Sequence, residues 1–185
     1  GIDLQLHGNN FCPEYPTCLT EDQIGDQDTS NCLGCPDGQI SPDNISCYDQ
    51  GDLDVLVAFA INSGMGSEYG DVIGMGTQTW DEDGRLTLWD CSNWGLSGTI
   101  PPEIGNLTEL TDLRLHLNVL TGTIPPEIGN LIELTSLYLN GNAELTGEIP
   151  PEIGNLTQLI TLYLFDSDLT GTIPSEIGNL VNFLD

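Results

Sequence analysis

The stretch GTIPPEIGNL at residues 98–107 recurs almost unchanged along the chain. It returns as GTIPPEIGNL at 122–131, as GEIPPEIGNL at 147–156 and as GTIPSEIGNL at 171–180. Successive copies begin 24 or 25 residues apart, at 98, 122, 147 and 171. A regular spacing of this size indicates a solenoid with one coil per repeat, because a single coil cannot bury its own leucines and must stack on its neighbours.

Apolar residues occupy the same columns of every copy when the copies are aligned on their Ile-Pro dipeptide. One repeat reads Leu110, Leu113, Leu115, Asn118, Leu120, Gly122, Ile124 and Pro125. Leucines at alternate positions predict one short strand per coil, and the prolines predict a short helical turn on the return path. We therefore expect an α/β solenoid of about four repeats of 24–25 residues over residues 86–185.

The consensus of these columns, LxxLxLxxNxLTGxIPxEIGNLxx, resembles the plant-type leucine-rich repeat family over residues 86–182. The resemblance implies a right-handed coil with a helical N-terminal cap, and a role as a receptor ectodomain, an enzyme inhibitor or a wall or surface protein. Three positions depart from the pattern. Trp94 and Ser167 replace an asparagine that satisfies loop backbone groups in that family, and Cys91 replaces a core leucine.

The chain is strongly acidic, with 29 Asp and Glu residues against two Arg and no Lys, and its formal net charge is −27. Such a chain repels phosphate backbones and anionic membranes, so we expect no nucleic-acid partner. An apolar content of 38% and three tryptophans nevertheless indicate a folded protein. No run of about 18 apolar residues is present, so the sequence predicts no membrane span.

Both ends of the sequence bear on where the protein acts. It begins at Gly1 without a methionine or an apolar targeting segment, which is typical of a secreted protein after removal of its signal peptide. The last residues, VNFLD at 181–185, enter a further repeat without a polar or cysteine-bearing cap. We expect a secreted or cell-surface protein. At the open last coil, either the chain was cut or a neighbouring subunit covers the end by self-association.

Residues 1–48 form the first of three expected segments, followed by a cap at 49–85 and the repeats at 86–185. The first segment is rich in Asp, Asn, Pro and Gly and holds five of the six cysteines. With few apolar residues to bury, it needs disulfides and hence an oxidising compartment. Five cysteines cannot all pair with one another, so we expect a disulfide set of Cys12, Cys18, Cys32, Cys35, Cys47 and Cys91.

Within this segment, CLGCPDGQISPDNISC at 32–47 is similar to the CxxCPxGxxS…C module of ephrin-receptor-like and tumour-necrosis-factor-receptor-like repeats. That resemblance implies a Cys35–Cys47 bridge. Zinc bound at Cys32 and Cys35 is the competing interpretation, but structural zinc sites bring a second Cys pair or a His pair, and only His7 lies nearby. We expect no structural metal here.

The cap begins with DLDVLVAFAINSG at 52–64, where apolar residues recur at helical spacing. Asp52 stands at the expected N-cap and Gly64 at the expected end of this helix, and the glycine-rich stretch at 64–76 predicts a flexible loop. In TWDEDGRLTLWD at 79–90, an Asp-Gly turn between two strands explains the pattern best. Its aspartates also stand at several offsets of an EF-hand loop, so calcium is an alternative there.

Residues between the leucines of each strand point away from the core, onto the concave face expected of a solenoid. Tyrosines and the cation Arg114 lie there, and a tyrosine ring with its polar tip suits stacking on a sugar or gripping a peptide. Ordinary cross-strand packing of aromatics is the alternative explanation. The expected ligand-binding residues are Asp90, Arg114, Tyr138 and Tyr163 in one column and His116, Asn140 and Phe165 in the next.

Two further ladders have structural explanations. The threonines of the LTG segments would form a flat array such as ice-binding proteins use, but Glu148 interrupts it. The glutamates Glu103, Glu127, Glu152 and Glu176 recur one coil apart. Their mutual repulsion in water, about 0.8 kcal/mol per pair, is offset by a favourable position in the first turn of a helix.

We expect N-linked glycans at Asn44, Asn106 and Asn155, each of which begins an Asn-x-Ser/Thr triplet. No cofactor is expected, and no catalytic motif is recognisable around His7 or His116, so we expect a protein that is not an enzyme. The sequence thus predicts a secreted or cell-surface recognition module that binds a protein, peptide or glycan on its concave face. The alternative is a structural subunit that assembles head to tail into an extracellular filament or matrix.

Overall fold

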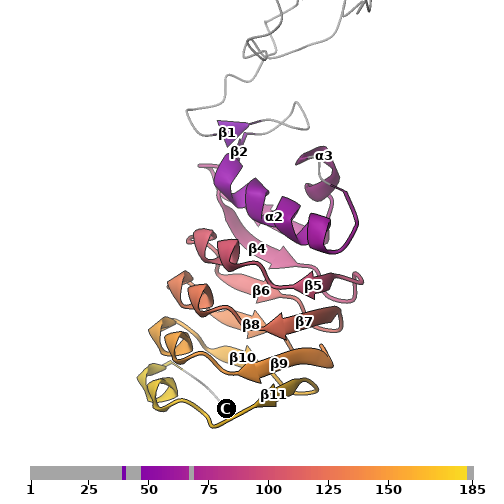
Figure 1. The fold of residues 1–185 in the computed structure, drawn as a ribbon. Helices are drawn as coiled ribbons and strands as arrows, with labels where there is room; N and C mark the ends of the chain where they lie inside the picture. Colours follow the sequence, from indigo (N-terminus) through magenta and orange to yellow (C-terminus); the bar gives the residue numbers. More distant parts are fainter. Residues whose placement is uncertain (1–38, 41–46, 67–68, 183–185) are drawn as a thin grey trace, which may run out of the picture.

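The structure, a computed structural model, describes residues 39–40, 47–66 and 69–182. In this part of the chain, coils stack one on another, with helix α2 (Gln50–Asn62) at one end of the stack (Figure 1). Each coil contributes a strand to each of two sheets and a short 3-10 helix. The predicted solenoid is confirmed.

The first sheet has the strand order β10-β8-β6-β4-β3. Equivalent residues of successive coils lie side by side, so that Leu113 is opposite both Trp89 and Leu137. The strand expected in each coil is thus present with the expected columns. The four parallel strands are β4 (Leu86–Asp90), β6 (Asp112–Arg114), β8 (Ser136–Tyr138) and β10 (Thr161–Tyr163), and β3 (Thr77–Trp80) pairs antiparallel with β4.

A second sheet, which the repeat pattern did not lead us to expect, is formed by the LTG segments. Its glycines have positive φ, and a β-carbon on Gly122 (φ 73°) would lie 2.9 Å from the Thr99 side chain of the preceding coil. Close stacking of the coils therefore requires glycine there. In the order β11-β9-β7-β5, the strands are β5 (Ser97–Thr99), β7 (Val119–Thr123), β9 (Glu144–Glu148) and β11 (Asp168–Thr170).

The helical turns predicted after the prolines are 3-10 helices on the edge of each coil. Between these helices and the two sheets lie the leucine columns, and Leu113, Leu115 and Leu137 have no exposed surface. The last coil is less covered, with Ile173 75% exposed. The four 3-10 helices are η2 (Pro102–Asn106), η3 (Pro126–Asn130), η4 (Pro151–Asn155) and η5 (Ser175–Asn179).

Helix α2 closes one end of the core, where its Phe59 ring packs edge-on against Trp89 with ring centres 4.9 Å apart. The N-cap expected at Asp52 is wrong. The helix is capped by Asp49, which accepts a hydrogen bond from the backbone N–H of Asp52 at 3.0 Å. The predicted end is confirmed, because Gly64 follows the C-cap with φ 68°.

Asp52 instead joins the cap to the first sheet. Its side chain is 1% exposed, and its two oxygens accept from Nε and Nη2 of Arg85 at 2.9 and 3.0 Å. It also accepts from the backbone N–H of Leu86 at 2.8 Å. The hydrogen bond to Asp52 raises the pKa of Arg85, whereas burial raises the pKa of Asp52. An ion pair between the buried Asp52 and the partly exposed Arg85 therefore fixes α2 against the start of β4.

The stretch expected to be a flexible loop contains a short helix, α3 (Tyr69–Val72). Val72 and Met75 are buried, and their carbonyl groups accept from the Gln78 side chain at 2.6 and 3.0 Å. These contacts hold the stretch against the core, which glycine content alone did not indicate. The Asp-Gly turn is confirmed, because Gly84 (φ 70°) lies between the antiparallel β3 and β4. A small antiparallel pair, β1 (Gln39–Ile40) and β2 (Tyr48–Asp49), precedes α2.

Cys91 is a free thiol without exposed surface, so its expected place in the disulfide set is wrong. It occupies the column of Leu115 and Leu139, which places its side chain in the core of the solenoid. Burial raises the pKa of this thiol to about 12. Cys47 is disulfide-bonded. The other predicted members of the set, and with them the Cys35–Cys47 pairing, lie outside the described residues: Cys12, Cys18, Cys32 and Cys35.

Asparagine side chains support the turns that follow β6 and β8, two neighbouring strands of the first sheet. Asn142 has no exposed surface, and its Nδ2 donates to the carbonyl groups of Leu115 and Leu139 at 3.0 and 2.7 Å. Its Oδ1 accepts from the backbone N–H of Leu120 at 3.1 Å. Asn118 does the same one coil earlier, where its Oδ1 accepts from the backbone N–H of Trp94 at 3.1 Å. We call these two residues the asparagine ladder.

Candidate binding face

The outward-pointing side chains of β4, β6, β8 and β10, and of the residues just after these strands, form what we call the strand face. Its central column was predicted from the repeat spacing and is confirmed by the strand register. Asp90 lies opposite Arg114, Arg114 opposite Tyr138, and Tyr138 opposite Tyr163. Stacking of coils thus brings together residues that are 24 or 25 positions apart in the sequence.

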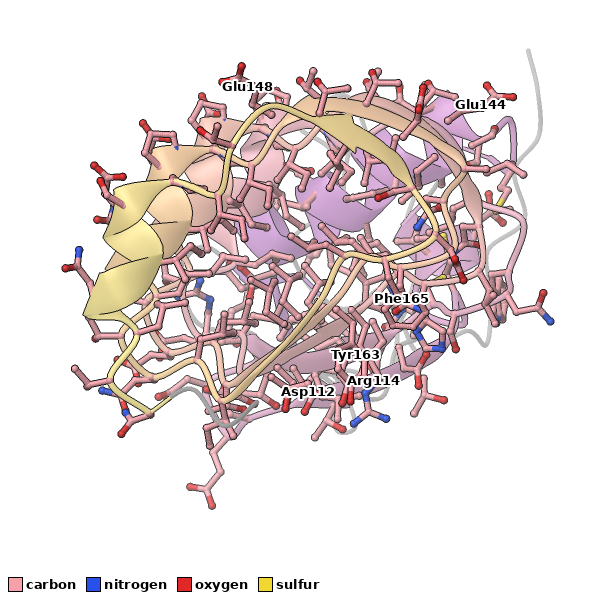
Figure 2. The ribbon with its side chains drawn as sticks, turned by 90° about the horizontal axis from the view of Figure 1, so that it is seen from below. Asp112, Arg114, Glu144, Glu148, Tyr163 and Phe165 are labelled. Atoms are coloured by element: carbon pink, nitrogen blue, oxygen red, sulfur yellow. The ribbon has the colours of Figure 1, made fainter. Side chains whose placement is uncertain are left out.

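A shallow depression with a cavity volume of about 320 Å³ lies on this face. Six of the seven residues predicted to bind a ligand line it, and the seventh, Asp90, lies beside it against Arg114. Figure 2 shows Arg114, Tyr163 and Phe165 close together on one side of the molecule. The lining residues are Arg114, His116, Tyr138, Asn140, Tyr163 and Phe165.

Arg114 is held by two carboxylates and an aromatic ring. Its Nε donates to Asp112 at 2.8 Å, and its Nη1 lies 3.7 Å from Asp90. The guanidinium carbon lies 5.5 Å from the centre of the Tyr138 ring, which is within the range of a cation–π contact. The hydrogen bond to Asp112 raises the pKa of Arg114. The sequence analysis missed Asp112, although its position two residues before Arg114 places both on the same face of one strand.

Asp90 is ionised more readily than an ordinary aspartate. Burial by itself would raise its pKa, but the Ser92 hydroxyl and backbone N–H, which donate to Oδ1 at 2.6 and 3.0 Å, more than offset this. The positive charge of Arg114 acts in the same direction, so the pKa of Asp90 lies below its usual value. The column therefore begins with a fixed negative charge.

The aromatic residues of the strand face form a continuous series. The Tyr138 and Tyr163 rings meet edge to face with centres 5.0 Å apart, and Tyr163 and Phe165 are tilted at 5.7 Å. His116 is tilted against Tyr138 at 5.8 Å. Although these rings pack together, Tyr163 is 44% and Phe165 57% exposed. Cross-strand packing alone therefore leaves a large part of the aromatic surface in contact with solvent.

Two polar atoms in the lining lack a partner. Oδ1 of Asn140 and Nδ1 of His116 are buried, and neither makes a hydrogen bond. Asn140 as a whole is 9% exposed. Buried side-chain polar atoms in proteins are usually bonded, so these two exceptions need an explanation. The repeat pattern identified both residues as members of the face but could not show that they are unbonded.

The opposite side of the molecule carries Glu144 and Glu148 of the second sheet (Figure 2). There Thr146 donates its hydroxyl to the carbonyl group of Gly122 at 3.1 Å, so part of the threonine ladder links neighbouring coils. Asn106 and Asn155, two of the predicted glycan acceptors, are exposed at the ends of η2 and η4. The third acceptor, Asn44, lies outside the described residues.

The described part of the chain was searched for metal-binding clusters and for membrane-spanning helices. Across residues 39–40, 47–66 and 69–182, no group of three or more His, Cys, Asp or Glu side chains is arranged to hold a metal ion. Among these same residues, no helix has the length and apolar character needed to cross a membrane.

The sequence matches the Leucine Rich Repeat family at residues 109–131, 133–156 and 158–180. No curated protein matches the chain. Among solved structures, the LRR ectodomain of the receptor kinase SOBIR1 from Arabidopsis thaliana is 29% identical with a TM-score of 0.61. That match covers 74% of this chain and 77% of the ectodomain.

Two further matches come from ligand-bound structures. The LRR ectodomain of the plant membrane receptor kinase GASSHO1/SCHENGEN3 from Arabidopsis thaliana, in complex with CASPARIAN STRIP INTEGRITY FACTOR 2, is 28% identical with a TM-score of 0.56 over 71% of this chain. A chain in the complex of the Arabidopsis receptor kinase HAESA with the peptide hormone IDA and the co-receptor SERK1 is 43% identical with a TM-score of 0.50 over 53%. The present chain spans 20% and 17% of those two chains.

The repeats, the parallel sheet and these matches agree with one another. The matched structures are ectodomains of plant receptor kinases, which lie outside the cell. This chain therefore contains leucine-rich repeats and has the solenoid fold of plant extracellular LRR ectodomains.

Proposed function

We propose that this chain is an extracellular recognition module that binds a peptide, or an extended segment of a protein, on its strand face. The observation that carries the proposal is the depression of about 320 Å³ lined by Arg114, His116, Tyr138, Asn140, Tyr163 and Phe165. Binding sites for small molecules and peptide side chains are typically concave and combine apolar surface with a few polar groups, and this depression joins three aromatic side chains to three polar ones.

The exposure of the aromatic residues supports this proposal. Tyr163 and Phe165 are 44% and 57% exposed, although the leucines behind them are buried or half-buried. Tyrosine and phenylalanine with free surface are enriched where one protein grips another, because a rigid ring covers much area at little cost in conformational entropy. A ligand laid across β8 and β10 would cover both rings.

The comparisons support a protein or peptide ligand. The matched HAESA structure contains a peptide hormone, and the matched GASSHO1/SCHENGEN3 ectodomain is in complex with an integrity factor. These are properties of those proteins, and they make a peptide the first class of ligand to test here. They also favour a non-enzymatic role. Self-association through the C-terminal coil, the alternative expected from the sequence, finds no support in these matches.

A selection from a random peptide library tests the proposal, with the full 185-residue chain as bait. Peptides retained by the wild type should be lost on a Tyr163→Ala/Phe165→Ala variant. The control is Val119→Ala, which removes apolar surface from a residue that is 58% exposed but belongs to the second sheet. Equal retention by both variants would move the binding site off the strand face, and an empty selection would contradict a peptide-binding role.

We also propose N-glycosylation at Asn106 and Asn155. Both are exposed at the ends of 3-10 helices on the edge of the solenoid, where an acceptor side chain is accessible to solvent. Mass spectrometry of the protein secreted from a eukaryotic host, before and after removal of N-glycans, tests this modification. Unmodified peptides at both positions would contradict it.

A further inference from the structure

The positive charge in the depression is already compensated by the protein. Arg114 donates to Asp112 at 2.8 Å and lies 3.7 Å from Asp90, so two carboxylates share one guanidinium. These three groups together carry a net negative charge. A ligand carboxylate that approached Arg114 would have to displace one of the aspartates and would be repelled by the other. The depression is therefore a poor site for an anionic group.

The rest of the chain strengthens this preference. Its only other cation is Arg85, which is bound to the buried Asp52 in the cap. With no lysine and a net charge of −27, the protein has no unpaired cation to offer an acidic ligand. The summed field of such a surface attracts cationic ligands and repels anionic ones.

Two side-chain atoms in the lining of the depression receive no hydrogen bond from the protein. Oδ1 of Asn140 and Nδ1 of His116 are buried without a partner in the lining of the depression. An amide oxygen can only accept, and an imidazole nitrogen accepts when the proton is on the other nitrogen. The Asn140 side-chain oxygen makes no hydrogen bond within the protein, whereas the Asn142 side chain is bonded, so the Asn140 amide can turn toward an incoming N–H group.

The aromatic rings offer a surface on which a cation can lie. Arg114 shows that the ring series accepts a guanidinium, since its central carbon lies 5.5 Å from the Tyr138 ring centre. Tyr163 and Phe165, the next rings of the series, have 44% and 57% of their surface exposed, and the Arg114 guanidinium lies on the Tyr138 ring and leaves theirs free. Lysine and arginine side chains bind such ring faces by cation–π attraction.

We propose that the depression is a pocket for the arginine or lysine side chain of a basic peptide. The cationic head lies on Tyr163 and Phe165, its N–H groups donate to Asn140 and His116, and Asp90 and Asp112 supply the attracting field. This inference rests on the proposed function and adds the chemistry of the ligand to it. A glycan would also bring donors and stack on the rings, but a neutral sugar gains nothing from the negative field.

The composition of the selected peptides is the first test. Peptides enriched by the wild-type chain should contain arginine or lysine far above its frequency in the library. One such peptide is then synthesised with its arginine replaced by citrulline, or its lysine by acetyl-lysine, which removes the charge and keeps the length. We expect the affinity to fall about tenfold or more, as measured by calorimetry, and to weaken with added salt for the charged peptide alone.

Variants of the pocket give an independent test. Asn140→Leu should weaken the charged peptide about tenfold while leaving the fold intact, since no bond within the protein is lost. Asp90→Asn/Asp112→Asn should free Arg114 and shift the preference from basic toward acidic peptides. The matched control is Glu144→Gln/Glu148→Gln, which removes the same number of charges from the opposite side of the molecule and should keep the basic preference (Figure 2).

The outcomes separate the two proposals. Enrichment of acidic or uncharged peptides that are lost on Tyr163→Ala/Phe165→Ala would overturn the cationic pocket and keep the peptide-binding function. An equal loss of basic preference in the Glu144/Glu148 control would also overturn the pocket, because the field would then be a property of the whole surface. No enriched peptide, or binding to a glycan array alone, would overturn both.

Discussion

Asn142 and Asn140 are two residues apart in the turn after β8, and the structure uses them in opposite ways. Asn142 has no exposed surface and binds the backbone of Leu115, Leu139 and Leu120 through its side chain. Asn140 is almost as buried, at 9% exposed, yet its Oδ1 has no partner. The same type of side chain therefore holds the backbone together at position 142 and has an unbonded acceptor oxygen at position 140.

The difference extends to the two regions that these residues represent. In the core, the side chains of the asparagine ladder form hydrogen bonds with backbone groups of the leucine columns, because a buried polar group without a partner would lower stability. On the strand face, polar and aromatic groups are left without full partners beside a depression. Under the proposed function, a ligand bound on the strand face would complete these bonds.

The largest expected difference between the core and the exposed surface is in the rate of cysteine alkylation, measured at Cys91. Because burial raises the pKa of this thiol to about 12, it stays protonated up to strongly alkaline pH. At about pH 8, the lower thiolate fraction should slow its reaction with iodoacetamide about a thousandfold relative to an exposed thiol. Mass spectrometry of the peptide that contains Cys91, from native and from urea-unfolded protein, measures this ratio. Equal rates would contradict the burial of Cys91.

The two arginines of the chain should differ next most. Arg85→Met leaves Asp52 buried without its partner and should lower the free energy of unfolding by about 3–5 kcal/mol. Arg114→Met, at a side chain 38% exposed, should cost under about 1 kcal/mol. Urea unfolding followed by circular dichroism compares the two variants.

The stability of Arg85→Met relative to the wild type should change with pH in a defined direction. Burial raises the pKa of Asp52 above its unfolded value, so the folded state takes up a proton more readily than the unfolded chain. The loss of unfolding free energy in Arg85→Met relative to the wild type should therefore be largest near neutral pH and shrink as the pH falls toward about 4. A deficit that grows on acidification would contradict an unpaired buried Asp52.

The two asparagines should differ by a smaller amount. Asn142→Ala leaves the N–H of Leu120 and the carbonyl group of Leu139 without their partner, whereas the Leu115 carbonyl still accepts from Asn118, and it should cost about 2–4 kcal/mol. Asn140→Ala removes an unbonded acceptor and should change stability by less than about 1 kcal/mol. Chemical denaturation of both variants under one set of conditions tests the distinction. Similar losses would show that Asn140 is also a structural residue.

Tyr163→Ala should have the smallest effect on stability. The side chain is 44% exposed on the last strand of its sheet, so its loss should cost about 1 kcal/mol or less, mainly from the contact with Tyr138. A thermal melt measures this, and the same sample should fail to retain the selected peptides. A variant that melts far lower would place Tyr163 in the structural group and weaken its assignment to the binding face.

Much of the strand face could be predicted from the sequence. A repeat of 24 or 25 residues brings equivalent positions side by side, so the column from Asp90 to Tyr163 followed from counting alone. Asp112 was missed because an acidic residue in so acidic a chain carries little information until its distance to Arg114 is known. Asp52 was wrongly assigned to the helix cap because its true partner, Arg85, is 33 residues away in the sequence and the pairing depends on the fold.

The sequence by itself determined the coil, its period and the side chains that share a face, because these depend on local geometry repeated without change. Only the tertiary structure decided which of those side chains are bonded. It showed Asn142 saturated and Asn140 unpaired, Cys91 enclosed as a free thiol, and Arg114 neutralised by Asp112 and Asp90. Hydrogen bonds and ion pairs depend on distances of a few ångströms between coils, and no pattern of residue types specifies those distances.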